Sequence, residues 1–165
     1  MTPYDFYNFK VLIIDDEPLM RKLVRGVLGS LGFMNITEAN SGRKAQELIS
    51  NHTFDFIITD WRMDDLDGID IINYVRGSQT LPRRNTPIIM LTGNTEVRHV
   101  KSAISAGVDS YMIKPFSAER LARRIRDLIE NPRDFIISGK YTGPDRRHTS
   151  GPFSEGPDRR KNKKR

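Results

Sequence analysis

Four short apolar runs do most to limit the folds that are open to this chain of 165 residues. The runs cover residues 11–14, 56–58, 88–91 and 111–113, and each is continuous rather than alternating with polar residues. Strands that are apolar on both faces are typical of a parallel sheet that is covered on both sides. A weaker strand is predicted over residues 34–39, which makes five strands in all.

Helical patterns separate these runs. After Pro18, apolar residues recur at steps of three and four as far as Leu31, and Gly32 follows as a stop signal. Four more helices are predicted, each after a residue that can cap its start: Ser41, Asp67, Thr95 and Ser117. Alternating strands and helices predict an α/β fold, a doubly wound five-stranded parallel sheet in the order 2-1-3-4-5 of the flavodoxin-like type.

Polar residues stand at the carboxyl end of the predicted strands. In chain order these residues are Asp15, Asp16 and Glu17, then Asp60, then Thr92, then Lys114. Ligands of such sheets bind beyond the carboxyl ends of the strands. Each residue alone is explained as well by a turn, a helix cap or a solvated charge. Because all of them come at the same edge of the sheet, the set together indicates a functional site.

Clustered carboxylates repel one another unless one is protonated or a cation lies between them. A site made of several carboxylate oxygens with room for water suits Mg²⁺. Lys114 adds a fixed positive charge, and Thr92 adds a hydroxyl donor. A nucleophilic oxygen, a metal, an ammonium group and a neutral donor are what phosphoryl transfer to a carboxylate needs.

The motifs "KVLIIDDEP", "IITDW", "IIMLTGN" and "DSYMIKPFS" lie within roughly residues 9–130. In this stretch the chain resembles the receiver domain of bacterial two-component response regulators, of the single-domain, chemotaxis-regulator-like type. The resemblance implies that Asp60 accepts a phosphoryl group from a sensor histidine kinase or a histidine phosphotransfer protein. It also implies a Mg²⁺ site formed by Asp15, Asp16, Asp60 and the backbone carbonyl of Arg62.

The same resemblance assigns the switching residues. Lys114 is expected to contact the phosphoryl oxygens, and Thr92 is expected to move toward them after phosphorylation. Tyr111 matches the aromatic position that rotates with that threonine, and Lys114-Pro115 matches the family's cis peptide bond. A phosphoryl group adds nearly two negative charges and three acceptors, so it favours one member of a two-state equilibrium. A downstream protein partner, which the sequence does not name, would then recognise a changed surface.

The end of the chain differs in composition from the rest. Residues 1–132 hold 17 Lys and Arg against 17 Asp and Glu, whereas residues 133–165 hold 10 against 4. The pentapeptide Gly-Pro-Asp-Arg-Arg occurs at 143–147 and again at 156–160. The sequence therefore predicts a receiver domain over 1–132 and a basic, flexible tail over 133–165.

Two rival functions stay open at this point. The first is a nucleic-acid or acidic-partner binder led by the basic tail, whose contacts to nucleic acid would be driven by phosphates. The second is a hydrolase with an aspartyl-phosphate intermediate, which needs a second acid close to Asp60 and a substrate cap. Our main interpretation is a regulator that is no enzyme beyond phosphorylating and dephosphorylating itself. The chain has no cysteine, signal-peptide core or membrane-length apolar run, so we expect a cytoplasmic protein without membrane contact.

Overall fold

A computed structural model describes residues 6–93 and 96–147 of the chain. Its main sheet has five parallel strands in the order β2-β1-β3-β4-β5, which confirms the predicted fold. The strands are β1 Lys10–Ile14, β2 Asn35–Ala39, β3 Phe56–Asp60, β4 Ile88–Thr92 and β5 Ser110–Ile113. The three central strands are apolar on both faces of the sheet. Continuous apolar runs of this kind need a cover on each face, and helices supply it.

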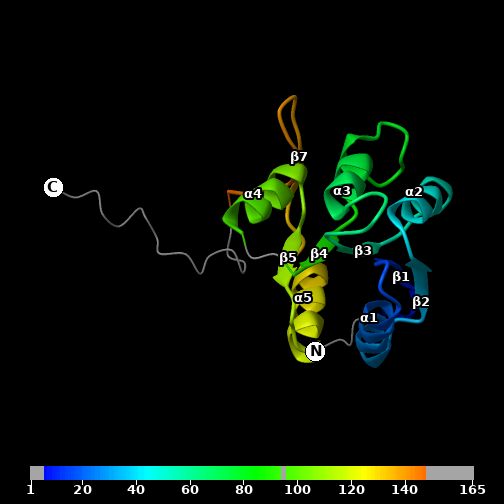
Figure 1. Cartoon of the computed structure of the whole chain (residues 1–165). Coiled ribbons are helices and arrows are strands. Elements are labelled where there is room, and N and C mark those ends of the chain that lie inside the picture. The colour runs from blue at the N-terminus through cyan, green and yellow to red at the C-terminus, as the bar shows by residue number, and fades with distance from the viewer. Residues whose placement is uncertain (1–5, 94–95, 148–165) are drawn as a thin grey trace.

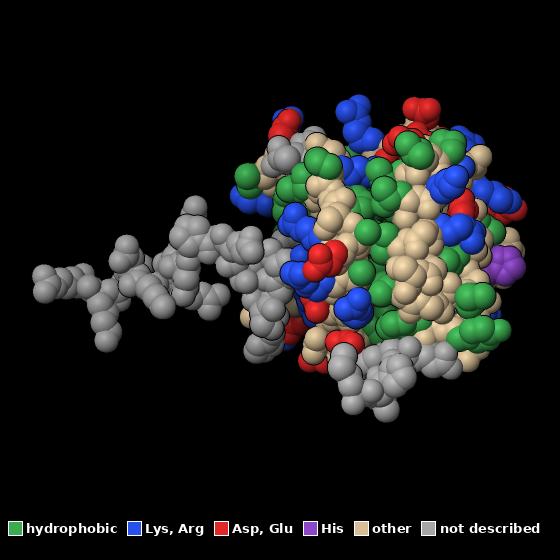
Figure 2. Space-filling view, turned by 90° about the horizontal axis from the view of Figure 1, so that it is seen from below, with side chains coloured by type: hydrophobic (Ala, Val, Ile, Leu, Met, Phe, Trp, Pro, Cys, Tyr) green, Lys and Arg blue, Asp and Glu red, His purple; other side chains and the backbone are tan. Residues whose placement is uncertain are grey.

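Five helices form the two outer layers. They are α1 Pro18–Ser30, α2 Gly42–Asn51, α3 Gly68–Gly77, α4 Val97–Ala106 and α5 Ala118–Glu130, and a short 3₁₀ helix, η1 Phe6–Asn8, precedes β1. Figure 1 shows α2, α3 and α4 on one side of the sheet and α1 and α5 on the other. Figure 2 looks at the α1 and α5 side, where side chains of both charges lie among apolar ones. In the described part of the chain no helix is long and apolar enough to cross a membrane.

Alternation along the strands divides the core into two parts. Val11 and Ile13 of β1 pack with α1 and α5, whereas Leu12 and Ile14 pack on the side of α2, α3 and α4. All four side chains are at most 1% exposed. The sheet is therefore buried on both faces, and only its edges are free to carry a polar site.

The helix starts follow from local chemistry. Ser41 and Ser117 accept a hydrogen bond from the backbone N–H three residues on, and Asp67 forms a capping box with Asp70. The predicted cap Thr95 lies outside the described residues, and α4 begins at Val97 after Glu96. Three of the four predicted caps are thus present as side-chain caps.

The segment after α5 differs from the flexible tail expected from the sequence. Residues Phe135–Ile137 (β6) and Thr142–Pro144 (β7) pair as an antiparallel hairpin. The first Gly-Pro-Asp-Arg-Arg copy begins within this hairpin, and the second copy lies outside the described residues. The high Pro and Gly content, which argues against a helix, is compatible with a tight hairpin.

The hairpin packs at the amino-terminal edge of β4 and β5. Its backbone passes close to Gly107, which has a φ of +100° and ends α4. A Cβ atom at Gly107 would lie only 2.6 Å from the Thr142 carbonyl oxygen, so this position requires glycine for two reasons. On the same edge, the guanidinium of Arg76 lies over the Phe135 ring at 5.3 Å.

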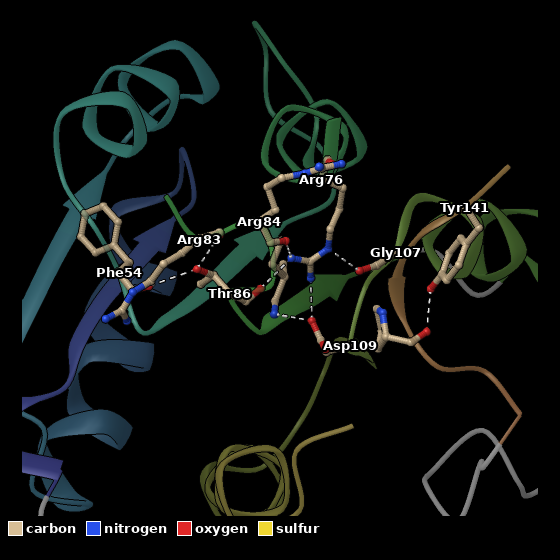
Figure 3. Close-up of polar contacts among 10 residues, drawn as sticks. Phe54, Arg76, Arg83, Arg84, Thr86, Gly107, Asp109 and Tyr141 are labelled. Carbon is tan, nitrogen blue, oxygen red and sulfur yellow. Dashed lines mark hydrogen bonds and ion pairs between the residues drawn. The ribbon is translucent and has the colours of Figure 1, made fainter. Parts of the chain in front are cut away.

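Arg76 is the centre of a buried polar network, which Figure 3 shows. Its guanidinium pairs with Asp109 at 2.8 Å and donates to the carbonyl oxygens of Gly107 at 3.0 Å and Thr86 at 2.8 Å. A further donor reaches the Arg84 carbonyl at 2.5 Å. The side chain is only 3% exposed, so the network replaces the water that this charge has lost.

We expect truncation to separate the two parts of the tail. Deleting 133–165 removes the cover from Arg76 and Gly107, and should lower the free energy of unfolding by about 2 kcal/mol. Deleting 148–165 alone leaves the hairpin in place and should leave that value unchanged. Urea unfolding of both truncated chains measures the difference, and equal midpoints would show that the hairpin does not stabilise the domain.

Candidate functional site

The carboxyl ends of four neighbouring strands, β1, β3, β4 and β5, bring the predicted residues together. Asp15 directly follows β1, Asp60 ends β3, Thr92 ends β4, and Lys114 directly follows β5. The parallel register places Ile14 beside Thr59 and Asp60 beside Leu91. The sequence prediction that these side chains share one edge is therefore met in the geometry of the sheet.

Lys114 links the two acids that lie deepest in the site. Its ammonium Nζ donates to Oδ1 of Asp60 at 2.9 Å and lies 3.3 Å from Oδ2 of Asp15. Asp15 and Lys114 are 99 residues apart in the chain. The Lys114–Pro115 peptide bond is cis, as the resemblance implied, and the backbone N–H of Lys114 donates to the Thr92 carbonyl at 2.7 Å.

Three carboxylates converge beside this ammonium group. Asp15, Asp16 and Asp60 each offer an oxygen, and these oxygens lie within 4.8 Å of one another. Asp15 is buried, Asp60 is half-buried, and Asp16 is exposed. Several carboxylate oxygens at a site that is open to solvent suit Mg²⁺, which prefers oxygen ligands and usually keeps several of its waters. The side chains present fit such an ion, and the Arg62 carbonyl remains a predicted fourth ligand.

The electrostatics of the site favour a cation. Burial raises the pKa of Asp15, and the Asp60 charge adds to this effect, while the Glu17 backbone N–H and Lys114 oppose it. Burial acts to lower the pKa of Lys114, but the hydrogen bond and charge of Asp60, together with Asp15, outweigh it and raise that pKa. Lys114 therefore stays charged, and a divalent ion would relieve the remaining repulsion between the carboxylates.

Local contacts fix the backbone at the phosphoacceptor candidate. A Cβ atom at Gly68 would lie 2.4 Å from the carbonyl oxygen of Asp60, so only glycine allows α3 to start here. The N–H of Gly68 also donates to the Trp61 carbonyl at 2.7 Å. Asp65, in the same loop, accepts from the backbone N–H groups of Gly42 and Arg43 at the start of α2. The acidic loop after β3 thus follows the phosphoacceptor candidate directly and also binds the start of α2.

The predicted switch residues are in contact with each other. The Thr92 hydroxyl is hydrogen-bonded to the phenol of Tyr111, and Tyr111 is 7% exposed. Burial raises the pKa of the Tyr111 hydroxyl, although the bond to Thr92 opposes this effect. Arg62 is exposed. The geometry therefore joins Tyr111 to Thr92, whose carbonyl in turn accepts from the backbone N–H of Lys114.

Sequence reasoning missed two sets of residues near the site. Arg21 of α1 donates to the Asp15 carbonyl at 2.8 Å and pairs with Glu38, so it supports the end of β1. Trp61 follows Asp60 and stacks with His99 of α4. The Arg21–Glu38 pair and the Trp61–His99 stack have no signal in the sequence beyond an ordinary arginine or histidine on a helix, because each joins residues 17 or more positions apart.

Comparison with known proteins agrees with this geometry. A family model described as the response regulator receiver domain matches residues 11–126. Chemotaxis protein CheY-3 of Vibrio cholerae is 36% identical over 123 residues, which cover 74% of this chain and 93% of that protein. Chemotaxis protein CheY of Pseudomonas aeruginosa is 36% identical over 121 residues, or 73% and 96% of the two chains.

Solved structures give the same result. The chemotaxis response regulator CheY4 of Vibrio cholerae has a TM-score of 0.67 at 30% identity, covering 73% of this chain and 98% of that one. The receiver domain of a sensor histidine kinase from Pseudomonas aeruginosa has a TM-score of 0.66 at 28% identity, covering 74% and 98%. That structure has a magnesium ion coordinated in its active site cleft.

The family match sets what is general for such a chain. Receiver domains accept a phosphoryl group, bind Mg²⁺ at an acidic pocket, and interact with histidine kinases and phosphotransfer proteins. They are generally signal transducers rather than enzymes that turn over separate substrates. Since the family model matches more than half of the sequence, this chain belongs to the response regulator receiver domain family and is related to the chemotaxis regulators within it.

Proposed function

We propose that this protein is a response regulator that is switched by phosphorylation of Asp60. The observation that carries the proposal is the convergence of three carboxylates with the Lys114 ammonium at one edge of the sheet. The phosphoryl donor is a sensor histidine kinase or a histidine phosphotransfer protein, and the output is the binding of a protein partner.

In the transfer step, a carboxylate oxygen of Asp60 forms a bond to the phosphorus atom of the donor phosphohistidine. The bond from phosphorus to the imidazole nitrogen breaks, and its electron pair stays on that nitrogen. Asp15, Asp16, Asp60 and the Arg62 carbonyl would hold Mg²⁺, which supplies positive charge beside the phosphoryl oxygens. Water later attacks the phosphorus of this acyl phosphate, the bond from phosphorus to the Asp60 oxygen breaks, and inorganic phosphate leaves the restored carboxylate.

Lys114 and Thr92 then each form new hydrogen bonds to the phosphoryl group. The Lys114 ammonium, now on Asp60, is in reach of the new phosphoryl oxygens, and the Thr92 hydroxyl turns from Tyr111 toward them. Tyr111 loses a hydrogen-bond partner and changes the surface formed by α4, β5 and α5. That surface includes Val97, which is 68% exposed, and is where we place the downstream partner.

A second surface suits the phosphoryl donor. Leu19 and Leu23 lie one helical turn apart at the start of α1 and are 72% and 43% exposed. This helix begins three residues after Asp15, so its first turn is close to the acidic edge of the sheet. Exposed apolar side chains next to a reactive group suit a protein that must bring its phosphohistidine to Asp60.

Incubation with acetyl phosphate tests the function without a partner. With Mg²⁺ present, the intact mass of the full chain should rise by one phosphoryl group, and EDTA should prevent the rise. A chain that gains no mass at any acetyl phosphate concentration would refute the proposal.

Lys114→Ala tests the role of the ammonium group. We expect incorporation to slow by about a hundredfold, the order of effect for a lost electrostatic donor, while phosphorylation-dependent partner binding is lost. Lys44→Ala is the matched control, because Lys44 is exposed on α2 and forms a surface ion pair with Glu47. Normal partner binding by phosphorylated Lys114→Ala would rule out this role.

A further inference from the structure

His99 joins helix α4 to the residue after the phosphoacceptor. Its imidazole lies nearly flat against the Trp61 indole, with ring centroids 5.1 Å apart and an interplanar angle of 27°. Tyr111 meets the same indole edge-on, at 6.3 Å and 84°. Trp61 is therefore held between a residue of α4 and the switch tyrosine of β5.

Trp61 itself has little freedom to move. Its backbone N–H donates to the Leu91 carbonyl at 2.9 Å, and its carbonyl accepts from Gly68 at 2.7 Å. The side chain is only 8% exposed. Because one backbone group is tied to β4 and the other to the first residue of α3, the indole is a fixed surface, and His99 on α4 is the partner that can leave it.

One ring nitrogen of the His99 imidazole lacks a hydrogen bond in this arrangement. Nδ1 of His99 is buried and has no hydrogen-bond partner among the residues that the structure describes. A buried polar atom without a partner carries a free-energy cost, which is why such atoms are rare in folded proteins. The stack is favourable and the orphaned nitrogen is unfavourable, so the contact holds α4 in place only weakly.

In the arrangement seen, the polar groups of the site are bonded to one another. Both groups that would meet a phosphoryl group are occupied, Lys114 by Asp60 and Thr92 by Tyr111. A movement of α4 that frees His99 would let Nδ1 reach water and would remove one of the two aromatic contacts of Trp61. A phosphoryl group that favours such a movement would be coupled to release of the imidazole, and the coupling would act in both directions.

We propose that His99 is a positioning residue of the switch, whose stack on Trp61 holds α4 in the resting position and whose orphaned nitrogen keeps that hold weak. This inference rests on the proposed phosphorylation of Asp60. It predicts that the chemistry at residue 99 sets how readily the domain takes up a phosphoryl group, although the side chain touches none of the reacting atoms.

Two substitutions at this position should act in opposite directions. His99→Phe keeps a flat ring on Trp61 and removes the orphaned nitrogen, so it should stabilise the resting state and lower the phosphorylated fraction at limiting acetyl phosphate. His99→Ala removes the stack and should raise that fraction. For His99→Phe we expect about a fivefold fall in the phosphorylation equilibrium, the low end of what one unsatisfied buried atom is worth. His99→Ala loses the packed ring together with the nitrogen, and these losses partly cancel, so we expect a smaller rise of about twofold.

The experiment measures the phosphorylated fraction of the full chain by intact mass at fixed Mg²⁺, over a range of acetyl phosphate. Trp61 is the sole tryptophan of the chain, so its fluorescence reports directly whether the stack has changed. Arg98→Ala is the matched control on the same helix, because Arg98 is 76% exposed and pairs with Glu96.

The outcomes separate this inference from the proposed function. Opposite shifts of the phosphorylated fraction for the two variants, with Arg98→Ala at the wild-type value, support a positioning role. Variants that alter thermal stability and fluorescence but leave phosphorylation at the wild-type level give His99 a structural role only and overturn the inference. A wild-type chain that takes up no phosphoryl group overturns the function itself, and with it this inference.

Discussion

Asp60→Asn is expected to abolish the uptake of a phosphoryl group from acetyl phosphate and Mg²⁺, as measured by intact mass. The change keeps the size and the hydrogen-bonding shape of the side chain but removes the nucleophilic carboxylate. Lys114 would lose its 2.9 Å charged partner while keeping Asp15, so the fold should be retained.

Asp64→Asn is the control for this result. Asp64 is exposed in the same acidic loop, four residues along the chain, and takes no part in the cluster of carboxylates. It should be phosphorylated as readily as the wild type. Equal phosphorylation of Asp60→Asn and the wild type would contradict the assignment of the acceptor, whichever way the control behaves.

Arg76→Ala is expected to have the largest effect on stability, a loss of about 3–5 kcal/mol in the free energy of unfolding. The substitution leaves Asp109 buried without its counter-charge and leaves the Gly107 and Thr86 carbonyls without a donor. Arg83→Ala is the matched control, because that side chain is half exposed and its pair with Asp55 is a surface contact worth at most about 1 kcal/mol.

A double substitution shows whether the loss comes from the unpaired charge. Arg76→Met with Asp109→Asn removes both charges and keeps an oxygen that accepts from the Ile88 backbone N–H. Much of the stability lost in Arg76→Ala should return, because the double variant buries no lone ion. A double variant that is as unstable as the single one would show that packing, rather than the ion pair, explains the effect.

The pH dependence of stability gives an independent check on the same pair. Burial raises the pKa of Asp109 to about 6 in spite of the Arg76 guanidinium, so the folded state binds a proton here more tightly than the unfolded state does. The free-energy cost of burying this charged carboxylate is present in full above pH 6. It becomes smaller as the pH falls toward the ordinary pKa of an aspartate, which is near 4. Arg76→Ala should therefore lose less stability at pH 5 than at pH 8, in urea unfolding at both values.

The sequence carried enough information for the sheet and for the edge on which the candidate site lies. Apolar runs and helix caps are local patterns, and parallel strands bring their carboxyl ends to one edge whatever the details of packing. For this reason the grouping of Asp15, Asp60, Thr92 and Lys114 could be predicted from residues up to 99 positions apart.

The parts that could not be predicted depend on which side chains meet in three dimensions. Arg76 and Asp109 are 33 residues apart, and an arginine at the end of a helix looks solvated from the sequence alone. The segment after α5 was expected to be flexible because it is rich in Gly and Pro. It is ordered as a hairpin because it packs against Arg76 and Gly107, which the sequence does not place near it. The stack of His99 on Trp61 is of the same kind.

The most direct test of the central claim is to locate the phosphoryl group on the chain. After incubation with acetyl phosphate and Mg²⁺, borohydride reduction converts an aspartyl phosphate to homoserine, and peptide mass spectrometry then identifies the residue. We predict homoserine at position 60 of the wild-type chain, and none when Mg²⁺ is removed by EDTA. Homoserine at another position, or at position 60 in equal amount without Mg²⁺, would contradict the account.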